Sequence, residues 1–393
     1  MSVLPPLALY VHLPWCERKC PYCDFNSYHS PGKLPEESYL LALSAELDHL
    51  VATSEQRALH SIFIGGGTPS LFSPQAIESL LLSIKSRFAL VNAAEITLEA
   101  NPGSAEAAKF AAYRQAGVNR LSIGIQSFNN ASLLKLGRVH NRGEALAAIA
   151  AARQAGFDNI NLDLMHGLPG QSLTDAEADL EQALEFAPEH LSWYQLTIEP
   201  NTAYANQPPT LPDELVLAEI QDCGEAVLKQ AGMRRYEISA FAKTGFPSQH
   251  NLNYWQFGDY LGIGAGAHDK LTQRSAQGDL KIVRSQNTRS PNDYLAREGR
   301  PISNSRTVTA QELPLEFMMN ALRLENGVDS RLFKQRTGLT LDTIAPALDK
   351  LVGHGLIHPW AQRLQTTDLG YRFLNTVLAE FDLASEEHIC SSS

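Results

Sequence analysis

Three cysteines near the N-terminus have a spacing that suits iron–sulfur chemistry. Cys16, Cys20 and Cys23 form the pattern C-x-x-x-C-x-x-C. Iron–sulfur clusters are held by cysteine thiolates, and a cubane cluster presents four irons to be bound. Three thiolates hold three irons and leave the fourth free to chelate another molecule. The pattern therefore predicts an electron-transferring cluster with one open coordination position.

A structural zinc site is the alternative for these cysteines. Such sites take four ligands, commonly as paired C-x-x-C units. No second pair follows Cys23, and only His12 stands nearby as a possible fourth ligand. We therefore favour the cluster. Cys223 and Cys390 are the remaining cysteines; they imply no disulfide framework, and a reducing cytoplasm is the expected compartment.

Short β-rich runs alternate with helical runs over the first 230 residues. The predicted strands are Leu7–Leu13, Ser61–Ile64, Glu95–Glu99, Arg120–Gln126, Asn159–Met165 and Leu191–Ile198. The predicted helices are Glu36–Val51, Pro74–Phe88, Ala105–Ala116, Arg142–Ala155, Thr174–Phe186 and Asp213–Ala231. Six such alternations predict parallel strands joined by right-handed crossovers.

Polar residues stand where several of these strands end. Glu99, Gln126 and Asp163 occupy such positions, and the glycine run 65–67 follows the second strand. Active sites of β/α barrels collect at the carboxyl ends of strands. A buried polar side chain costs roughly 1–3 kcal/mol unless it is paired. We therefore expect a shared ligand pocket, although a tight turn would also explain the glycines and a structural hydrogen bond would explain Gln126.

These motifs resemble the radical S-adenosylmethionine (radical SAM) superfamily from Leu7 to about Glu199, and its coproporphyrinogen-dehydrogenase branch over nearly the whole chain. The resemblance implies an α/β fold, a partial (β/α)6 barrel with a small C-terminal winged-helix-like domain. It implies a [4Fe–4S] cluster on the three cysteines, with Tyr10 beside it. The residues that it assigns to S-adenosylmethionine are Gly66, Gly67, Thr68, Glu99, Gln126, Arg138 and Asp163.

Two functions are open within this branch. The porphyrinogen-oxidising members carry a further cysteine two positions after the third, where Phe25 stands here, and a longer segment before the position of Tyr10. Haem chaperones of the HemW type resemble this chain better, in C-P-Y-C-D-F-N-S, in residues 191–200 and in H-N-L-N-Y-W at 250–255. That resemblance implies haem binding and delivery to respiratory apoproteins. The alternative is an oxygen-independent coproporphyrinogen III dehydrogenase. The sequence leaves open whether a chaperone of this type also turns over S-adenosylmethionine.

The H-N-L-N-Y-W run supplies the candidate haem ligand. An imidazole can bind haem iron, so His250 is a candidate for ligating or orienting haem, with Tyr254 and Trp255 packing on the macrocycle. A hydrogen-bonded core histidine is the alternative. His166 and His268 are competing donors. His268 ends the glycine-rich run 262–268, which fits a dinucleotide fingerprint poorly and favours close backbone packing near the cofactor.

The length of the chain predicts more than one domain. A chain of 393 residues exceeds the roughly 250–300 at which single cores stop growing. We expect a barrel over 1–240, an extension and linker over 241–305 that carries the H-N-x-x-Y-W run and the glycine-rich loop, and the C-terminal domain over 306–385. That domain is predicted to contain helices 312–324, 330–337 and 341–353, a hairpin over 356–364 and a last helix over 369–381.

Charge argues against a nucleic-acid partner, because the net charge is −11 and residues 306–393 hold 8 Lys/Arg against 11 Asp/Glu. No apolar run approaches 20 residues and no signal peptide is recognisable at the start. We therefore expect a cytoplasmic protein that contacts membrane proteins transiently at most. The oligomeric state is left open.

Overall fold

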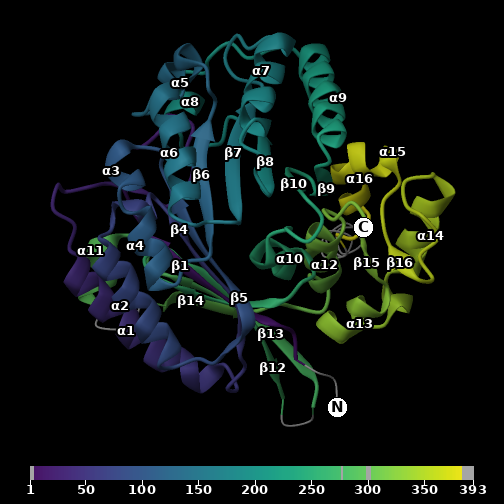
Figure 1. The fold of residues 1–393 in the computed structure, drawn as a ribbon. Coiled ribbons are helices and arrows are strands. Elements are labelled where there is room, and N and C mark those ends of the chain that lie inside the picture. Colours follow the sequence, from purple (N-terminus) through teal and green to yellow (C-terminus); the bar gives the residue numbers. More distant parts are fainter. Residues whose placement is uncertain (1–3, 276–277, 298–301, 383–393) are drawn as a thin grey trace.

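The computed structural model describes residues 4–275, 278–297 and 302–382. Six parallel strands form the centre of its main sheet and pair in chain order (Figure 1). They are β1 (Leu7–Leu13), β4 (Leu59–Gly66), β5 (Leu90–Ala100), β6 (Arg120–Gln126), β7 (Ile160–His166) and β8 (His190–Gln195). Each predicted strand coincides with one of these. The chain therefore has the predicted α/β class, with the six strands parallel and in chain order.

Helices between the strands cover the outer face of this sheet (Figure 1). They are α1 (Glu36–Thr53), η1 (Pro69–Leu71), α2 (Pro74–Lys85), α3 (Ser104–Ala107), α4 (Phe110–Ala116), α5 (Asn130–Lys135), α6 (Arg142–Gln154), α7 (Leu173–Leu184), α8 (Ala203–Asn206) and α9 (Glu214–Gln230). Capping boxes at Asn141 and Ser172 begin α6 and α7. The predicted helix Ala105–Ala116 is two short helices, α3 and α4.

Later segments widen the sheet at both edges. Strand β11 (Asp259–Ile263) lies parallel to β1, and β12 (His268–Arg274), β13 (Leu280–Asn287) and β14 (Ile302–Thr307) follow it antiparallel. At the other edge, β10 (Ala240–Ala242) and β9 (Arg234–Glu237) run antiparallel beyond β8. Helices α10 (Gln249–Trp255) and α11 (Pro291–Ala296) complete this part.

The described residues of 241–305 thus supply strands to both edges of the sheet. Within the expected extension and linker, residues 286–297 contain the end of β13 and helix α11. Their polarity is explained by the sheet. Antiparallel strands leave one face in water and carry polar side chains there, and β13 and β14 are mostly half-buried or exposed.

The C-terminal part is a compact group of helices with a two-stranded wing. It contains α12 (Leu313–Ala321), α13 (Arg331–Thr337), η2 (Leu341–Thr343), α14 (Ala345–Gly353), α15 (Asp368–Arg372) and α16 (Leu374–Ala379). The wing pairs β15 (Val328–Asp329) with β16 (Arg363–Leu364), so the second strand finds a distant partner rather than forming only the local hairpin expected over 356–364. Its core, around Phe317 and Phe333, continues onto Tyr236 and Phe257 of the neighbouring part.

No helix in the described ranges is both long and apolar enough to span a bilayer.

Candidate functional site

A cavity of about 520 Å³ lies at the carboxyl ends of the parallel strands. Ten of the residues singled out in the sequence for the cluster and S-adenosylmethionine line it: Cys16, Cys20, Cys23, Gly66, Gly67, Thr68, Glu99, Gln126, Arg138 and Asp163. Tyr10 and the candidate haem ligand His250 do not. The strand ends and the cysteine loop thus meet in one pocket, as expected for a β/α barrel.

Backbone pairing closes the cysteine loop. Strand β2 (Trp15–Cys16) pairs with β3 (Tyr28–His29), so the two ends of the loop lie side by side. Between them, Lys19 Nζ donates to the carbonyl oxygens of Phe25 (3.1 Å) and Ser27 (3.3 Å). The three thiols are therefore carried on a loop that is tied at its base and across its middle.

The donor set suits a cluster. Burial raises the pKa of the Cys16 and Cys23 thiols, so iron binding would displace their protons. In the described part of the chain, no three His, Cys, Asp or Glu side chains converge as ligands of a single metal ion. A cubane makes a different demand, because each thiolate binds its own iron.

The glycines after β4 let the cysteine loop approach closely. A Cβ at Gly67 would lie 2.6 Å from the carbonyl oxygen of Trp15. Gly66 has a φ of 121°, which disfavours any side chain. The N–H groups of Gly67 and Thr68 donate to the carbonyls of Leu13 and Trp15, both at 2.8 Å. These glycines are needed for packing as well as for access to a ligand.

Two carboxylates share the cavity wall. Glu99 accepts a hydrogen bond from the Gly66 N–H at 3.2 Å. Asp163 accepts from Ser122 Oγ (2.9 Å) and Asn161 Nδ2 (2.8 Å). Burial, with the charge of Asp163 as the second cause, raises the pKa of Glu99 to about 8, and burial also raises the pKa of Asp163. Two buried carboxyl groups whose negative charge is not fully balanced by nearby cations fit a cationic group of a ligand.

Arg138 and Gln126 also line this cavity, with Gln126 on β6 between the strands that carry Glu99 and Asp163. Arg138 donates to Asn101 Oδ1 (2.7 Å) and to the Gly124 carbonyl (2.9 Å), and it approaches Cys20 Sγ at 3.6 Å. Its buried Nε lacks a hydrogen-bond partner among the described residues. A buried unpaired donor is costly, so this part of the cavity fits a ligand that supplies an acceptor. Gln126 has a positive φ of 67° at the end of β6.

A second cavity, of about 550 Å³, adjoins the first and shares Asp24, Phe25, Gly66 and Glu99 with it. Its other lining residues are Tyr10, His12, Asn26, Tyr254, Tyr260, Gly266, Ala267, His268, Gln286 and Arg289. Tyr10 therefore faces this second cavity. Phe25, with 61% of its surface exposed, lines both cavities.

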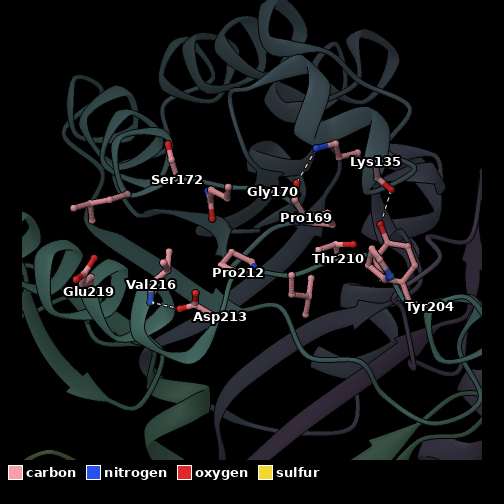
Figure 2. Close-up of a pocket in the computed structure, with 14 residues that line it drawn as sticks. Lys135, Pro169, Gly170, Ser172, Tyr204, Thr210, Pro212, Asp213, Val216 and Glu219 are labelled. Carbon is pink, nitrogen blue, oxygen red and sulfur yellow. Dashed lines mark hydrogen bonds between the residues drawn. The ribbon is translucent and has the colours of Figure 1, made fainter.

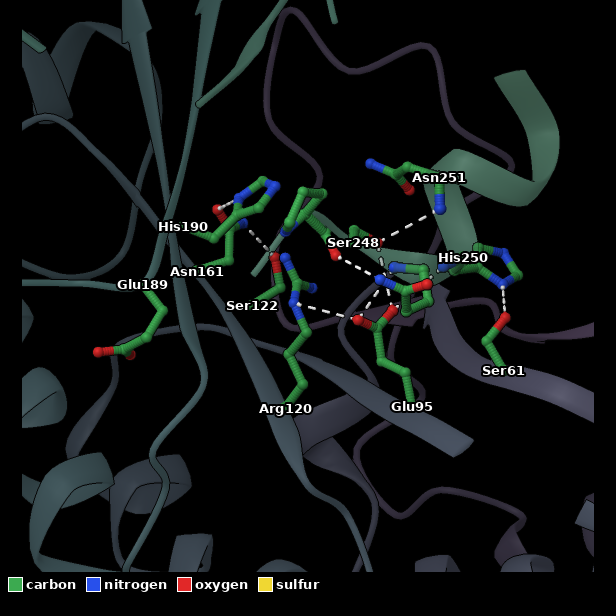
Figure 3. Close-up of polar contacts among 12 residues, drawn as sticks. Ser61, Glu95, Arg120, Ser122, Asn161, Glu189, His190, Ser248, His250 and Asn251 are labelled. Carbon is green, nitrogen blue, oxygen red and sulfur yellow. Dashed lines mark hydrogen bonds and ion pairs between the residues drawn. The ribbon is translucent and has the colours of Figure 1, made fainter. Parts of the chain in front are cut away.

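The H-N-L-N-Y-W run forms α10, and its histidine points inward. His250 is 4% exposed, and its Nδ1 lies 3.1 Å from Ser61 Oγ (Figure 3). Its ring stacks on Phe63 with centroids 4.9 Å apart. Burial lowers the pKa of His250 to about 3, so the ring is neutral. His166 is likewise buried, against Trp193.

Other residues of α10 reach three separate places. Asn251 lines the first cavity and Tyr254 lines the second. Trp255 packs with the C-terminal part, where the guanidinium of Arg323 lies 4.3 Å from its ring centroid. The helix therefore joins both cavities to the C-terminal core.

A third cavity, of about 830 Å³, is bordered by α5, α8 and the start of α9, and its lining residues are drawn in Figure 2. Lys135, Tyr204 and Asp213 line it, and none of the residues predicted to hold a cofactor does.

Sequence reasoning missed several residues of the two cavities. Asn101 and Ser122 hydrogen-bond Arg138 and Asp163, and both stand on or just after strands already predicted to end at the site. Their position on these strands could therefore have identified them as residues of the site. Tyr260 and Arg289 carry no comparable signal, because nothing local shows that β11 pairs with β1 or that Arg289, after β13, reaches the second cavity.

Comparison with known proteins agrees with this geometry. Residues 10–183 match the radical SAM superfamily, and residues 308–373 match the HemN C-terminal domain. The chain is 49% identical to the protein named heme chaperone HemW of Escherichia coli K12 over 97% of this chain and 99% of that one. It is 37% identical to the protein of that name from Bacillus subtilis 168, over 95% and 98%. Coproporphyrinogen III oxidase (HemN) from Escherichia coli, described as a radical SAM enzyme, has the same fold, with a TM-score of 0.80 at 24% identity over 96% of this chain and 90% of that one.

Proposed function

This chain belongs to the radical SAM family whose members are named heme chaperone HemW, and we propose on that premise that it binds haem and passes it to respiratory apoproteins. The observation that carries the proposal is the pair of adjoining cavities. The first has the thiols and carboxylates that a cluster and S-adenosylmethionine require. The second is lined by four aromatic residues and suits a flat, largely apolar macrocycle: Tyr10, Phe25, Tyr254 and Tyr260.

In this proposal Cys16, Cys20 and Cys23 hold a [4Fe–4S] cluster. Bound, the cluster would supply an electron to S-adenosylmethionine at its open iron. The chain's own residues bind and orient that ligand. Glu99 and Asp163 offer negative charge to its cationic amino group, and Arg138 offers a donor to its carboxylate. Gly66, Gly67 and Thr68 keep the cysteine loop against the end of β4, with Gln126 completing the pocket.

Haem is the cargo in this proposal, and α10 supports its site. Ser61 and Phe63 of β4 hold His250 in place, so this histidine orients α10 on the side that packs against the sheet. That anchoring directs Tyr254 into the second cavity. Because Phe25 and Glu99 line both cavities, a cofactor in one would lie next to haem in the other.

The direct test is haem transfer. Anaerobically reconstituted, haem-loaded protein is mixed with a separately purified respiratory apoprotein, and the absorption of the acceptor's haem centre is followed. We expect transfer that depends on the loaded chaperone and exceeds transfer from haem-loaded serum albumin. Equal rates from both donors would contradict the proposal. The protein's place of action is the cytoplasm in this reading, with contact to membrane-bound acceptors during delivery.

The alternative is a coproporphyrinogen III dehydrogenase, which the shared fold of coproporphyrinogen III oxidase favours. The wild-type protein, reduced and supplied with S-adenosylmethionine, should leave coproporphyrinogen III unchanged, because Phe25 stands where the porphyrinogen-oxidising enzymes carry a cysteine. Multiple-turnover decarboxylation detected by chromatography would establish the alternative instead.

A further inference from the structure

The second cavity contains two histidines, and a third, His250, lies close behind its wall. They differ in how far the ring is exposed and in how many ring nitrogens are hydrogen-bonded. His12 is only 5% exposed; its Nδ1 lies 3.0 Å from the Tyr10 hydroxyl, and its Nε2 lies 2.9 Å from the Asn26 carbonyl oxygen. Both nitrogens are therefore engaged. His250 is 4% exposed and has Nδ1 on Ser61, with its ring between Phe63 and Tyr254.

His268 differs from both. It begins β12 directly after the glycine-rich loop, its side chain is exposed, and it lines the second cavity. In the described ranges of the chain, its ring takes part in no hydrogen bond. Partial burial and the nearby Arg284 and Arg289 lower its pKa, which keeps the ring neutral and its lone pair available.

The glycine-rich loop fixes where His268 stands. The N–H of Gly264 donates to the buried Glu46 carboxylate at 3.0 Å, and the N–H of Ala265 donates to Tyr39 Oη at 2.8 Å. Asn26 Nδ2 donates to the Ala265 carbonyl at 3.0 Å. The loop is thereby held from both sides, so the position of His268 at the cavity wall is fixed by buried contacts of its neighbours.

The same wall carries a cation and aromatic surface. Arg289 lines the cavity and is exposed, with Nε 3.4 Å from Asn26 Oδ1. Tyr254 and Tyr260 stack on each other with centroids 4.2 Å apart. A metal-binding imidazole, a guanidinium and stacked aromatic rings are the complement of an iron, a carboxylate and a macrocycle.

We propose that His268, rather than His250, binds the haem iron, and that Arg289 pairs with a haem propionate in the second cavity. This inference rests on the proposed function, since it names the site at which the cargo is held. In this inference α10, which carries the H-N-x-x-Y-W run, forms one wall of the second cavity. Tyr254 faces the haem, and His250 anchors the helix.

Haem titration with absorption spectroscopy tests the assignment. The full-length protein with its cluster reconstituted is compared with His268→Ala, Arg289→Gln and, as matched control, His354→Ala, an exposed histidine of the C-terminal part. Loss of the iron ligand should weaken haem binding about tenfold or more and shift the Soret band. Arg289→Gln should weaken binding while the band stays in place, and His354→Ala should match wild type.

Two further measurements separate ligation from folding. Added imidazole should restore the wild-type band in His268→Ala, and metal-free protoporphyrin should bind His268→Ala and wild type alike. Wild-type binding and an unshifted band in His268→Ala would overturn the inference while leaving the proposed function intact. Absence of haem binding by the wild-type protein would instead overturn the proposed function.

Discussion

The carboxylate of Glu95 on β5 accepts a hydrogen bond from the backbone N–H of His250 on α10, at 3.2 Å (Figure 3). It also accepts from the Gln249 N–H (3.1 Å) and from Ser248 Oγ (3.3 Å). Arg120 lies 3.9 Å away as an ion-pair partner. One buried side chain from the barrel therefore holds the first turn of the helix that faces both cavities.

Replacing Glu95 should loosen α10. Glu95→Leu leaves buried N–H donors without an acceptor and Arg120 without its counter-charge, so we expect the free energy of unfolding to fall by about 3 kcal/mol. Glu95→Gln keeps one acceptor oxygen and should cost less. Urea denaturation measures both. Glu78→Leu on the exposed face of α2 is the control. Equal stability of Glu95→Leu and this control would contradict the anchoring role.

The cluster prediction concerns iron content. Cys16→Ala, Cys20→Ala and Cys23→Ala each remove a thiolate ligand, so anaerobic reconstitution of each should give little or no [4Fe–4S] absorption. Cys223→Ala should retain it, because the Cys223 thiol lies on the outer helices, where it donates a hydrogen bond to the Glu177 carboxylate. Iron and sulfide analysis with electron paramagnetic resonance checks both results. Iron loss in Cys223→Ala would contradict a three-cysteine site.

The barrel could be predicted from the sequence because its signals are local. Buried parallel strands appear as short apolar runs, and helix ends carry capping residues, as at Asn141 and Ser172. The meeting of Glu99, Gln126 and Asp163 followed from a general rule for strand ends. The cysteines proposed to hold the cluster were identified from their spacing, and the structure places all three at the same cavity.

What could not be predicted depends on contacts between distant segments. Strand β16 finds β15 because Gly327, with a positive φ of 56°, lets the backbones meet, and no local pattern shows this. His250 faces inward because Phe63 and Ser61 of β4 receive it. The second cavity brings Tyr10, Phe25, Tyr254 and His268 together from four separate parts of the chain.

Asp179 on α7 should act as a positioning residue for the strained turn after β6. It accepts from Ser127 Oγ and the Phe128 N–H, both at 2.7 Å, directly after Gln126 with its positive φ. Asp179→Ala should lower the free energy of unfolding by about 2 kcal/mol and also weaken S-adenosylmethionine binding.

Asp175→Ala on the same helix provides the matched control. It removes the capping box with Ser172 and should cost about 1 kcal/mol without reaching Gln126. Isothermal titration calorimetry on cluster-loaded protein compares the two. A normal affinity in Asp179→Ala would show that Gln126 keeps its conformation unaided.

The last prediction uses the raised pKa of Glu99. With a pKa of about 8, this carboxyl is protonated in the ligand-free protein at neutral pH, because burial and the charge of Asp163 disfavour its ionised form. Its proton-linked contribution to stability is fully present below its ordinary pKa and is lost as pH rises through 8, so the ligand-free fold should weaken over that interval.

Ligand binding should show the opposite trend. The cationic amino group of S-adenosylmethionine favours the Glu99 carboxylate, so binding must release a proton at neutral pH. Between pH 6 and 7.5 the ligand's α-amino group stays largely protonated, and affinity should rise by close to tenfold per pH unit, the limit for release of one proton. Calorimetry in buffers of different ionisation enthalpy measures that proton directly.

Glu99→Gln isolates the carboxyl from the other acids of the cavity. It preserves the size of the side chain but cannot ionise, so affinity should fall and both the pH slope and the proton release should disappear. Asp163 remains in this variant and would sustain the slope if it were the group that titrates. Proton release of the wild-type size in Glu99→Gln would therefore transfer the linkage to Asp163 and remove Glu99 from contact with the amino group.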